Sequence, residues 1–413
     1  MTVFSKTEQE TGRESARRFE SRISRSELAY WKAIPAGQQP DWGDEWLIGN
    51  VRADLAGLPP LVRWDEVQAL RTVLARAAAG ELHLVQAGDC AEDPAECVPD
   101  ALDRKVALLA RLADAMRLGT GKPVATVGRI AGQFAKPRSR PTERHGDIEL
   151  PAFRGLLVNG PEPDADSRRP DPLRLLACYR AAQTATAHLR DTAAAASPDG
   201  PAVWTSHEAL VLDYEVPLTR RDGHGRLLLT STHWPWIGER TRDPYQAHVS
   251  LLAAVSNPVA CKVGPTISAD ELLALCARLD PEREPGRLTL IARIGANLTA
   301  ERLPRLVAAV RSAGHPVLWM CDPMHANTET TADGRKTRLL RTVLREVRDF
   351  RAAVTAEGGV AAGLHLETTP DPVTECVTDE SEYARVGENG YTTLCDPRLN
   401  ADQALAVAAA WGR

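Results

Sequence analysis

The chain has 413 residues, 43% of them hydrophobic and 25% charged, and its formal net charge is −5. This composition is typical of a globular enzyme with a sizeable core, and the acidic balance excludes the broad basic field that attracts nucleic acids or anionic membranes. No apolar run approaches the roughly 18 residues of a membrane-spanning helix, and the first residues lack the apolar core of a signal peptide. We therefore expect a cytoplasmic protein with no nucleic-acid or membrane partner.

Eight cysteines stand at irregular spacing without a CxxC pair. This pattern indicates neither a disulfide framework nor a structural zinc site, so we expect reduced thiols. Residues 1 to about 25 are polar without sustained periodicity, and they fit either a frayed arm or a helix that needs a partner surface. With the following stretch, in which we find no interpretable motif, they form a predicted N-terminal extension over residues 1–75.

Eight short, apolar, β-rich runs follow in chain order. They are residues 82–88, 123–130, 202–208, 232–238, 257–265, 287–295, 316–323 and 361–369. Segments with helical spacing lie between most of them, at 101–118, 171–190, 268–279, 300–314 and 335–354. Continuous apolar strands that alternate with amphipathic helices predict a parallel sheet covered by helices. Eight such units favour a closed (β/α)8 TIM barrel, an α/β fold, over residues 76–413.

An open doubly wound sheet is the alternative to the barrel. It would need fewer strands and usually a glycine-rich nucleotide turn, and GRIAGQ at 128–133 is not that fingerprint. One unit departs from the alternation, because RRDGHGR at 220–226 precedes LLLTSTHW and DGHG supplies a turn. We predict a small β-hairpin there, as a local decoration of the barrel.

Polar residues at the ends of the predicted strands indicate a metal site, because the active site of this fold is built there. Cys90 follows the first strand, His325 follows the seventh, Glu367 lies in the eighth, and Asp396 lies in the loop before the last helix. Each alone is more typical of packing or of a salt bridge. Together, a thiol, an imidazole and two carboxylates suit a borderline divalent ion such as Mn, Fe, Co or Zn.

A second set of strand-end residues is mostly cationic. It comprises Arg129, Lys136, Arg138, Ser139, Glu239, Arg240, Lys262 and Arg293. An unpaired cation buried in a barrel strand is costly to desolvate, so these side chains need an anion. Structural ion pairs could supply it at single positions, but phosphate groups match the whole set better. We therefore expect two phosphorylated ligands.

Several stretches resemble a known family, the type II or plant-like 3-deoxy-D-arabino-heptulosonate 7-phosphate (DAHP) synthases. The matching motifs are QAGDCAE, GRIAGQFAKPRS, WTSHEALVLDYE, WIGERTR, NPVACKVGP, CDPMHANT, VTEC and CDPRLN, spread from about residue 30 to the C-terminus. The resemblance implies a TIM barrel and a metal-dependent transferase. Its reaction condenses phosphoenolpyruvate with D-erythrose 4-phosphate and water, releases inorganic phosphate, and opens the shikimate pathway to the aromatic amino acids.

The resemblance also implies residue roles. Cys90, His325, Glu367 and Asp396 fall on the metal-ligand positions, with Mn as the expected ion and Co, Fe or Zn as alternatives. The implied substrate-binding positions are Arg129, Lys136, Arg138, Ser139, Trp236, Glu239, Arg240, Lys262, Arg293 and Lys336. Among these, Arg138, Ser139 and Lys336 would face the aldose phosphate. Lys136, Glu239 and His325 would be catalytic, the first two by transferring protons or positioning water.

Some residues depart from the family pattern. Ala87 and Ala326 stand where the family usually has glycine, Leu156 replaces the aspartate of an RGD triplet, and residues 369–372 replace a glycine-containing turn. None of these changes removes a metal ligand or a phosphate-binding cation. The connection between residues 190 and 204 is shorter than in long members with a helical regulatory insertion, so we expect no feedback by Phe, Tyr or Trp.

Short forms of this kind resemble copies that serve secondary metabolism, and this favours such a pathway here. One alternative is formation of amino-DAHP from an amino or imino analogue of erythrose 4-phosphate. Another is a non-catalytic relative kept as a binding partner, for example of a chorismate mutase, although every expected ligand and cation is present. The resemblance also implies a homo-oligomer, either a dimer or a tetramer.

Overall fold

A closed barrel of eight parallel strands forms the centre of the protein, which is described by a computed structural model over residues 21–196 and 203–412. The strands are β2 (His83–Gly88), β3 (Val124–Arg129), β6 (Trp204–Glu208), β9 (Trp234–Ile237), β10 (Val259–Val263), β11 (Leu288–Ala292), β12 (Leu318–Cys321) and β15 (Val360–Glu367). Their order around the barrel is β10-β11-β12-β15-β2-β3-β6-β9. Each predicted β-rich run coincides with one of these strands, so the predicted TIM barrel is confirmed.

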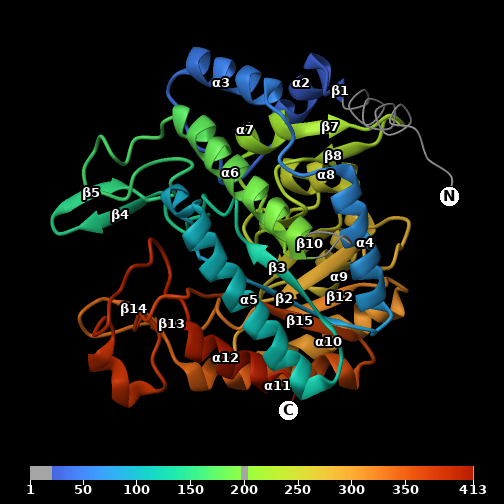
Figure 1. The fold of residues 1–413 in the computed structure, drawn as a ribbon, viewed down its shortest axis with the longest axis vertical. Helices are drawn as coiled ribbons and strands as arrows, with labels where there is room; N and C mark the ends of the chain where they lie inside the picture. The colour runs from blue at the N-terminus through green and yellow to red at the C-terminus, as the bar shows by residue number, and fades with distance from the viewer. Residues whose placement is uncertain (1–20, 197–202, 413) are drawn as a thin grey trace, which may run out of the picture.

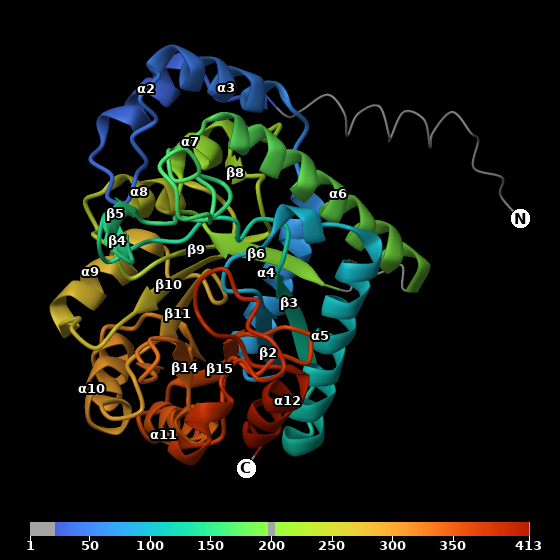
Figure 2. The same cartoon turned by 90° about the vertical axis from the view of Figure 1, so that its left-hand side faces the viewer.

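Helices surround the strands, as Figure 2 shows. They are α5 (Pro99–Thr120), α6 (Leu173–Ala196), α8 (Ala247–Ala254), α9 (Ala269–Leu279), α10 (Thr299–Ser312), α11 (Leu340–Ala356) and α12 (Ala401–Ala410). Local sequence explains their ends: Ser268 and Glu271 form a capping box that starts α9, and Gly121 with φ 71° ends α5. Apolar residues at helical spacing, such as Leu272 and Leu275, turn one face of α9 to the core.

The N-terminal region adds α2 (Arg25–Ala33), α3 (Glu45–Gly57) and α4 (Trp64–Ala78). Leu70 and Leu74 of α4 belong to the same buried cluster as Leu84 and Leu318 of the barrel strands. Helix α4 is thereby part of the barrel core. The expected division at residue 75 falls inside this helix, and the split into an extension and a barrel stays a prediction.

Short elements decorate the barrel. The predicted hairpin is present as β7 (Thr219–Arg221) and β8 (Leu227–Leu229), and β1 (Ser21–Arg22) pairs with β7 as a third strand. Two further hairpins were not predicted: β4 (Thr142–His145) with β5 (Ile148–Pro151), and β13 (Thr328–Thr330) with β14 (Lys336–Arg338). Figure 1 shows the β4–β5 hairpin projecting from the body of the protein. The remaining short helices are η1 (Pro94–Glu96), α7 (Leu212–Glu215), η2 (Val216–Leu218) and η3 (Glu380–Arg385).

Two sequence predictions need correction. The segment predicted as a helix from residue 335 begins with β14, because residues 336–338 pair with the antiparallel strand β13, and α11 starts only at Leu340. Residues 192–196 continue α6 instead of belonging to a loop connection, because their alanines favour helix. The predictions for residues 1–20 and 197–202 lie outside the described residues. Among the described helices, none has the length and apolar content that a membrane span requires.

Candidate active site

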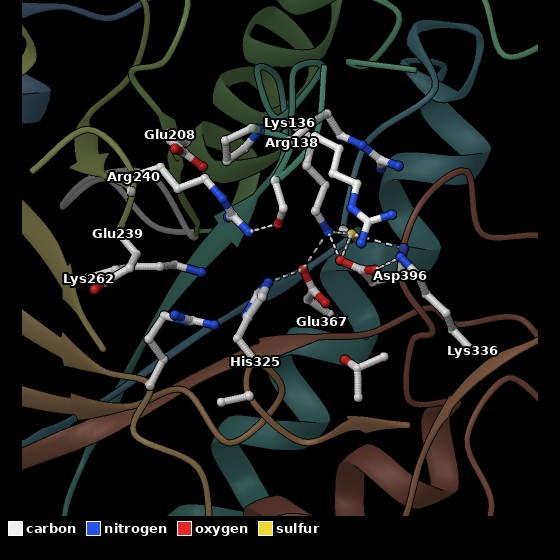
Figure 3. Close-up of a pocket in the computed structure, with 18 of the residues that line it drawn as sticks. Lys136, Arg138, Glu208, Glu239, Arg240, Lys262, His325, Lys336, Glu367 and Asp396 are labelled. Carbon is white, nitrogen blue, oxygen red and sulfur yellow. Dashed lines mark hydrogen bonds and ion pairs between the residues drawn. The ribbon is translucent and has the colours of Figure 1, made fainter. Parts of the chain in front are cut away.

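One cavity of about 1250 Å³ collects every side chain that the sequence marked as a site residue. Its lining includes Cys90, Arg129, Lys136, Arg138, Ser139, Trp236, Glu239, Arg240, Lys262, Arg293, His325, Lys336, Glu367 and Asp396 (Figure 3). Many of them end a barrel strand or follow one directly. Parallel strands place their C-terminal ends at the same mouth, which explains how residues far apart in sequence converge here.

Three of the four predicted metal ligands form a compact cluster. One ligand atom each from Cys90, Glu367 and Asp396 lies within 4.8 Å of the others. The ammonium of Lys136 hydrogen-bonds to the Cys90 sulfur and to the Asp396 carboxylate, and its Nζ lies 3.8 Å from Glu367 Oε1. The cluster is therefore an anionic cradle that already contacts one cation.

His325, the fourth predicted ligand, lies at the edge of this cluster. Its Nε2 is 3.3 Å from Glu367 Oε1 (Figure 3). Its Nδ1 lies 2.8 Å from Asp322 Oδ2. Burial lowers the pKa of His325 to about 4, and the neighbouring carboxylates only partly offset this effect. A neutral imidazole is the form that can donate a nitrogen lone pair to a metal.

The two carboxylates of the cluster, Glu367 and Asp396, lie among several cations. Burial opposes ionisation of Glu367, yet the cations beside it hold the pKa of that carboxyl well below its usual value. Arg338 Nη1 lies 2.8 Å from Glu367 Oε2, and Arg129 Nη2 lies 3.2 Å from Oε1. Burial and the nearby carboxylates raise the pKa of the Cys90 thiol well above its usual value. A divalent cation bound in the cradle would favour the thiolate instead.

The cationic half of the cavity is built around Trp236. The Arg129 guanidinium lies 5.2 Å and the Lys262 ammonium 5.9 Å from the centre of the Trp236 ring. Lys262 Nζ also lies 2.9 Å from Asp322 Oδ2, so at this position the structural ion pair that was the alternative to a bound anion is present. Arg293, by contrast, makes no side-chain hydrogen bond or ion pair within residues 21–196 and 203–412.

The outer part of the cavity contains the residues expected to face an aldose phosphate. Arg240 hydrogen-bonds to the Ser139 hydroxyl, and Lys336 Nζ donates to Asp396 Oδ1 at 2.8 Å. Arg138 pairs with Glu143 of the β4–β5 hairpin at 2.8 Å, a contact that sequence reasoning did not foresee. The residues predicted to bind the two phosphorylated substrates thus line one continuous cavity.

Sequence reasoning missed several charged residues of the site, among them Glu208, Asp322 and Arg338. Glu208 ends β6 and Asp322 follows β12, so the same reasoning about strand ends could have identified them. Glu208 is buried, its Oε1 has no hydrogen-bond partner among the described residues, and burial raises its pKa. Arg338 carried no such signal, because its segment was predicted as a helix.

A family model described as the class-II DAHP synthetase family matches residues 26–200 and 194–411 of this chain. The chain belongs to the class-II DAHP synthetase family. It is 54% identical over 376 residues to a probable phospho-2-dehydro-3-deoxyheptonate aldolase of Pseudomonas fluorescens, covering 91% of this chain and 94% of that relative. It is 40% identical over 426 residues to a phospho-2-dehydro-3-deoxyheptonate aldolase of Streptomyces coelicolor, covering 92% and 95%. The predicted family is thereby confirmed.

A solved structure shares the fold of this DAHP synthetase family member. It is the phospho-2-dehydro-3-deoxyheptonate aldolase of Francisella tularensis, with a TM-score of 0.52 over 88% of this chain and 95% of that one. The sequences are 13% identical, so this likeness supports the barrel alone.

Proposed function

We propose that this chain condenses phosphoenolpyruvate with D-erythrose 4-phosphate and water to give DAHP and inorganic phosphate. The chain is a DAHP synthase by family, as its relatives at 54% and 40% identity also are by name. The observation that carries the proposal is the single cavity that joins an anionic cradle to a set of arginines and lysines. Such a cavity can hold a metal ion and two phosphorylated substrates side by side.

The cradle fits a divalent metal ion, which Cys90, Glu367, Asp396 and the Nε2 of His325 would hold. A sulfur, an imidazole nitrogen and carboxylate oxygens are the donor set of a borderline divalent ion, and Mn is our first expectation. When bound, such an ion supplies Lewis-acid polarisation of a carbonyl oxygen. The contact of Lys136 with the same cradle supports the site. The ammonium of this side chain shows that the cradle attracts a positive charge.

The cationic residues would bind and orient the two substrates. Arg129, Lys262 and Arg293 would hold the anionic groups of phosphoenolpyruvate against Trp236, and Arg240 and Glu239 would complete that pocket. The residues facing the aldose phosphate would be Arg138, Ser139 and Lys336. Holding both substrates in one orientation converts a bimolecular reaction into an effectively unimolecular one.

The reaction also requires proton transfers. A carbon–carbon bond forms between the enol carbon of phosphoenolpyruvate and the aldehyde carbon of erythrose 4-phosphate, and the aldehyde oxygen takes up a proton. Water then adds to the phosphoenolpyruvate carbon that is left positive, and phosphate departs from that carbon. Lys136 can donate a proton, since its ammonium lies within the cradle. Glu239 has a buried oxygen without a hydrogen-bond partner among the described residues, which suits a group that positions the water or accepts its proton.

Phosphate release from phosphoenolpyruvate tests this proposal. We expect release with erythrose 4-phosphate, little release with its amino or imino analogue, and loss of activity in chelator that Mn or Co restores. Release with the analogue alone would identify an amino-DAHP synthase. No release with either aldose would favour the non-catalytic alternative.

Other predictions accompany this proposal. Homo-oligomerisation, a cytoplasmic location, a secondary-metabolite pathway and binding of a chorismate mutase stay predictions from the family resemblance. Sedimentation analysis of the purified chain, alone and with a chorismate mutase, would test the two statements about assembly.

A further inference from the structure

Asp322 is a fully buried carboxylate that contacts both halves of the cavity. It follows β12 directly, and its Oδ1 accepts hydrogen bonds from the backbone N–H groups of Met324 and His325, both at 3.1 Å. Its Oδ2 accepts from Lys262 Nζ at 2.9 Å and from His325 Nδ1 at 2.8 Å. The same His325 Nδ1 also lies 3.0 Å from Oδ1. Both oxygens therefore act as acceptors: Oδ1 accepts from the backbone N–H groups, Oδ2 accepts from Lys262, and His325 Nδ1 is within reach of both.

The contact with His325 determines which ring nitrogen carries the proton. An ionised carboxylate can only accept, so Nδ1 must be the donor of this hydrogen bond. Nε2, which lies 3.3 Å from Glu367 Oε1 at the edge of the cradle, is then the ring nitrogen whose lone pair a metal can take. The opposite tautomer would place a proton where a metal ligand needs a lone pair.

Asp322 also supplies the negative charge that balances the Lys262 ammonium within barrel strand β10. Lys262 is buried, and Asp322 is its ion-pair partner among the described residues. The pair also holds the ammonium on the side of the cavity where it lies 5.9 Å from the Trp236 ring. His365 Nε2 lies 4.0 Å from Asp322 Oδ2, too far to replace either contact.

We propose that Asp322 is a positioning residue that serves both functional halves of the cavity, by fixing the tautomer of His325 for metal binding and the place of Lys262 for anion binding. The inference rests on the proposed function, which assigns these two side chains to a metal and to phosphoenolpyruvate. It predicts that one buried carboxylate controls two separate binding equilibria.

The substitution Asp322→Asn tests this coupling. An amide has the size of the carboxylate but only one acceptor oxygen, so it can satisfy either the backbone N–H groups or Lys262, and its N–H₂ group meets another donor in both orientations. The dissociation constant for Mn²⁺ alone should rise about 10- to 100-fold. The dissociation constant for phosphoenolpyruvate alone should rise about 10-fold or more. Calorimetry of the full chain measures both, and circular dichroism reports the fold.

Two matched variants separate the halves. Lys262→Met should weaken phosphoenolpyruvate binding and leave Mn²⁺ binding within about two-fold, whereas His325→Ala should weaken Mn²⁺ binding and spare phosphoenolpyruvate. The inference is wrong if folded Asp322→Asn keeps either affinity at the wild-type level. Failure of the wild type to bind Mn²⁺ would instead overturn the proposed metal site, and this inference with it.

A measurement on the wild type keeps the inference testable even if Asp322→Asn does not fold. In metal-free protein with ¹⁵N-labelled histidine, the side-chain signals that disappear in His325→Ala should show a protonated Nδ1. An unprotonated Nδ1 would overturn the proposal whatever the activity of the variants.

Discussion

At the scale of single residues, the thiol of Cys90 distinguishes a metal cradle from an ordinary polar pocket. Cys90→Ser should be folded but nearly inactive, because it removes the one sulfur ligand from the three-residue cluster. Phosphate release and Mn²⁺ affinity measure the effect, and Cys395→Ser, which removes the neighbouring thiol outside the cluster, should keep most activity. Full activity of Cys90→Ser in metal-free buffer would contradict the assignment.

The two alanines that replace family glycines should respond in opposite ways. Ala326 has φ 66°, in the left-handed region that favours glycine, whereas Ala87 lies within β2 and is absent from the residues with positive φ. Ala326→Gly relieves about 1–2 kcal/mol of backbone strain and loses about 0.4–1 kcal/mol through the unfolded state, so we expect a net gain between about 0 and about 1.6 kcal/mol. Ala87→Gly should cost about 0.5–1 kcal/mol, and urea unfolding compares the two.

At the scale of elements, the ends of β10 and β11 present two cations with different surroundings. Lys262→Met and Arg293→Met should both raise the apparent Michaelis constant for phosphoenolpyruvate. Only Lys262→Met should also lower stability, because it leaves the buried Asp322 without its ion-pair partner, while Arg293 makes no side-chain ion pair among the described residues. Unchanged constants in both variants would mean that the two cations serve structure alone.

Glu346 of α11 joins the two loops that carry Arg293 and His325. It accepts hydrogen bonds from the Gly295 backbone N–H at 2.8 Å, from the Thr299 hydroxyl at 3.0 Å, and from the Asn327 side-chain amide. Burial raises the pKa of Glu346 to about 7. The folded state therefore holds this proton more tightly than the unfolded state does.

This raised pKa has a definite effect on stability. Between about pH 4.5 and 7 the folded state binds more protons at Glu346, so its contribution to the free energy of unfolding falls as the pH rises through that window. Glu346→Gln removes the titrating group and should flatten this part of the profile, whatever its effect on absolute stability. Urea unfolding at several pH values measures the slope, and an identical slope in both proteins would contradict the assignment.

At the scale of the whole molecule, the protein should be insensitive to Phe, Tyr and Trp. Feedback needs a second site whose occupancy differs between two states, and α6 ends at Ala196 only a few residues before β6 begins at Trp204. A helical insertion has no room between these elements. Titration with each amino acid and with pairwise mixtures at millimolar levels tests the prediction, and inhibition beyond about two-fold would reveal a site.

The predicted N-terminal extension over residues 1–75 is the remaining place where we expect that an effector could bind. Differential scanning calorimetry of the intact chain with each amino acid tests binding independently of activity, because a ligand that binds the folded state raises Tm.

The sequence by itself predicted the barrel and most of the side chains that line the central cavity. Hydrophobic residues recur with different periods in strands and helices, so the alternation of the two patterns predicted all eight strands. The carboxyl ends of the parallel strands necessarily share one mouth of the barrel. Tertiary structure decided the pairings across that mouth. The contacts of Asp322 with Lys262 and of Arg338 with Glu367 join residues from different units, and no local pattern encodes which charge meets which. Distances between side chains depend on barrel closure, and this is why the sequence predicted Lys262 as a site residue but not its partner.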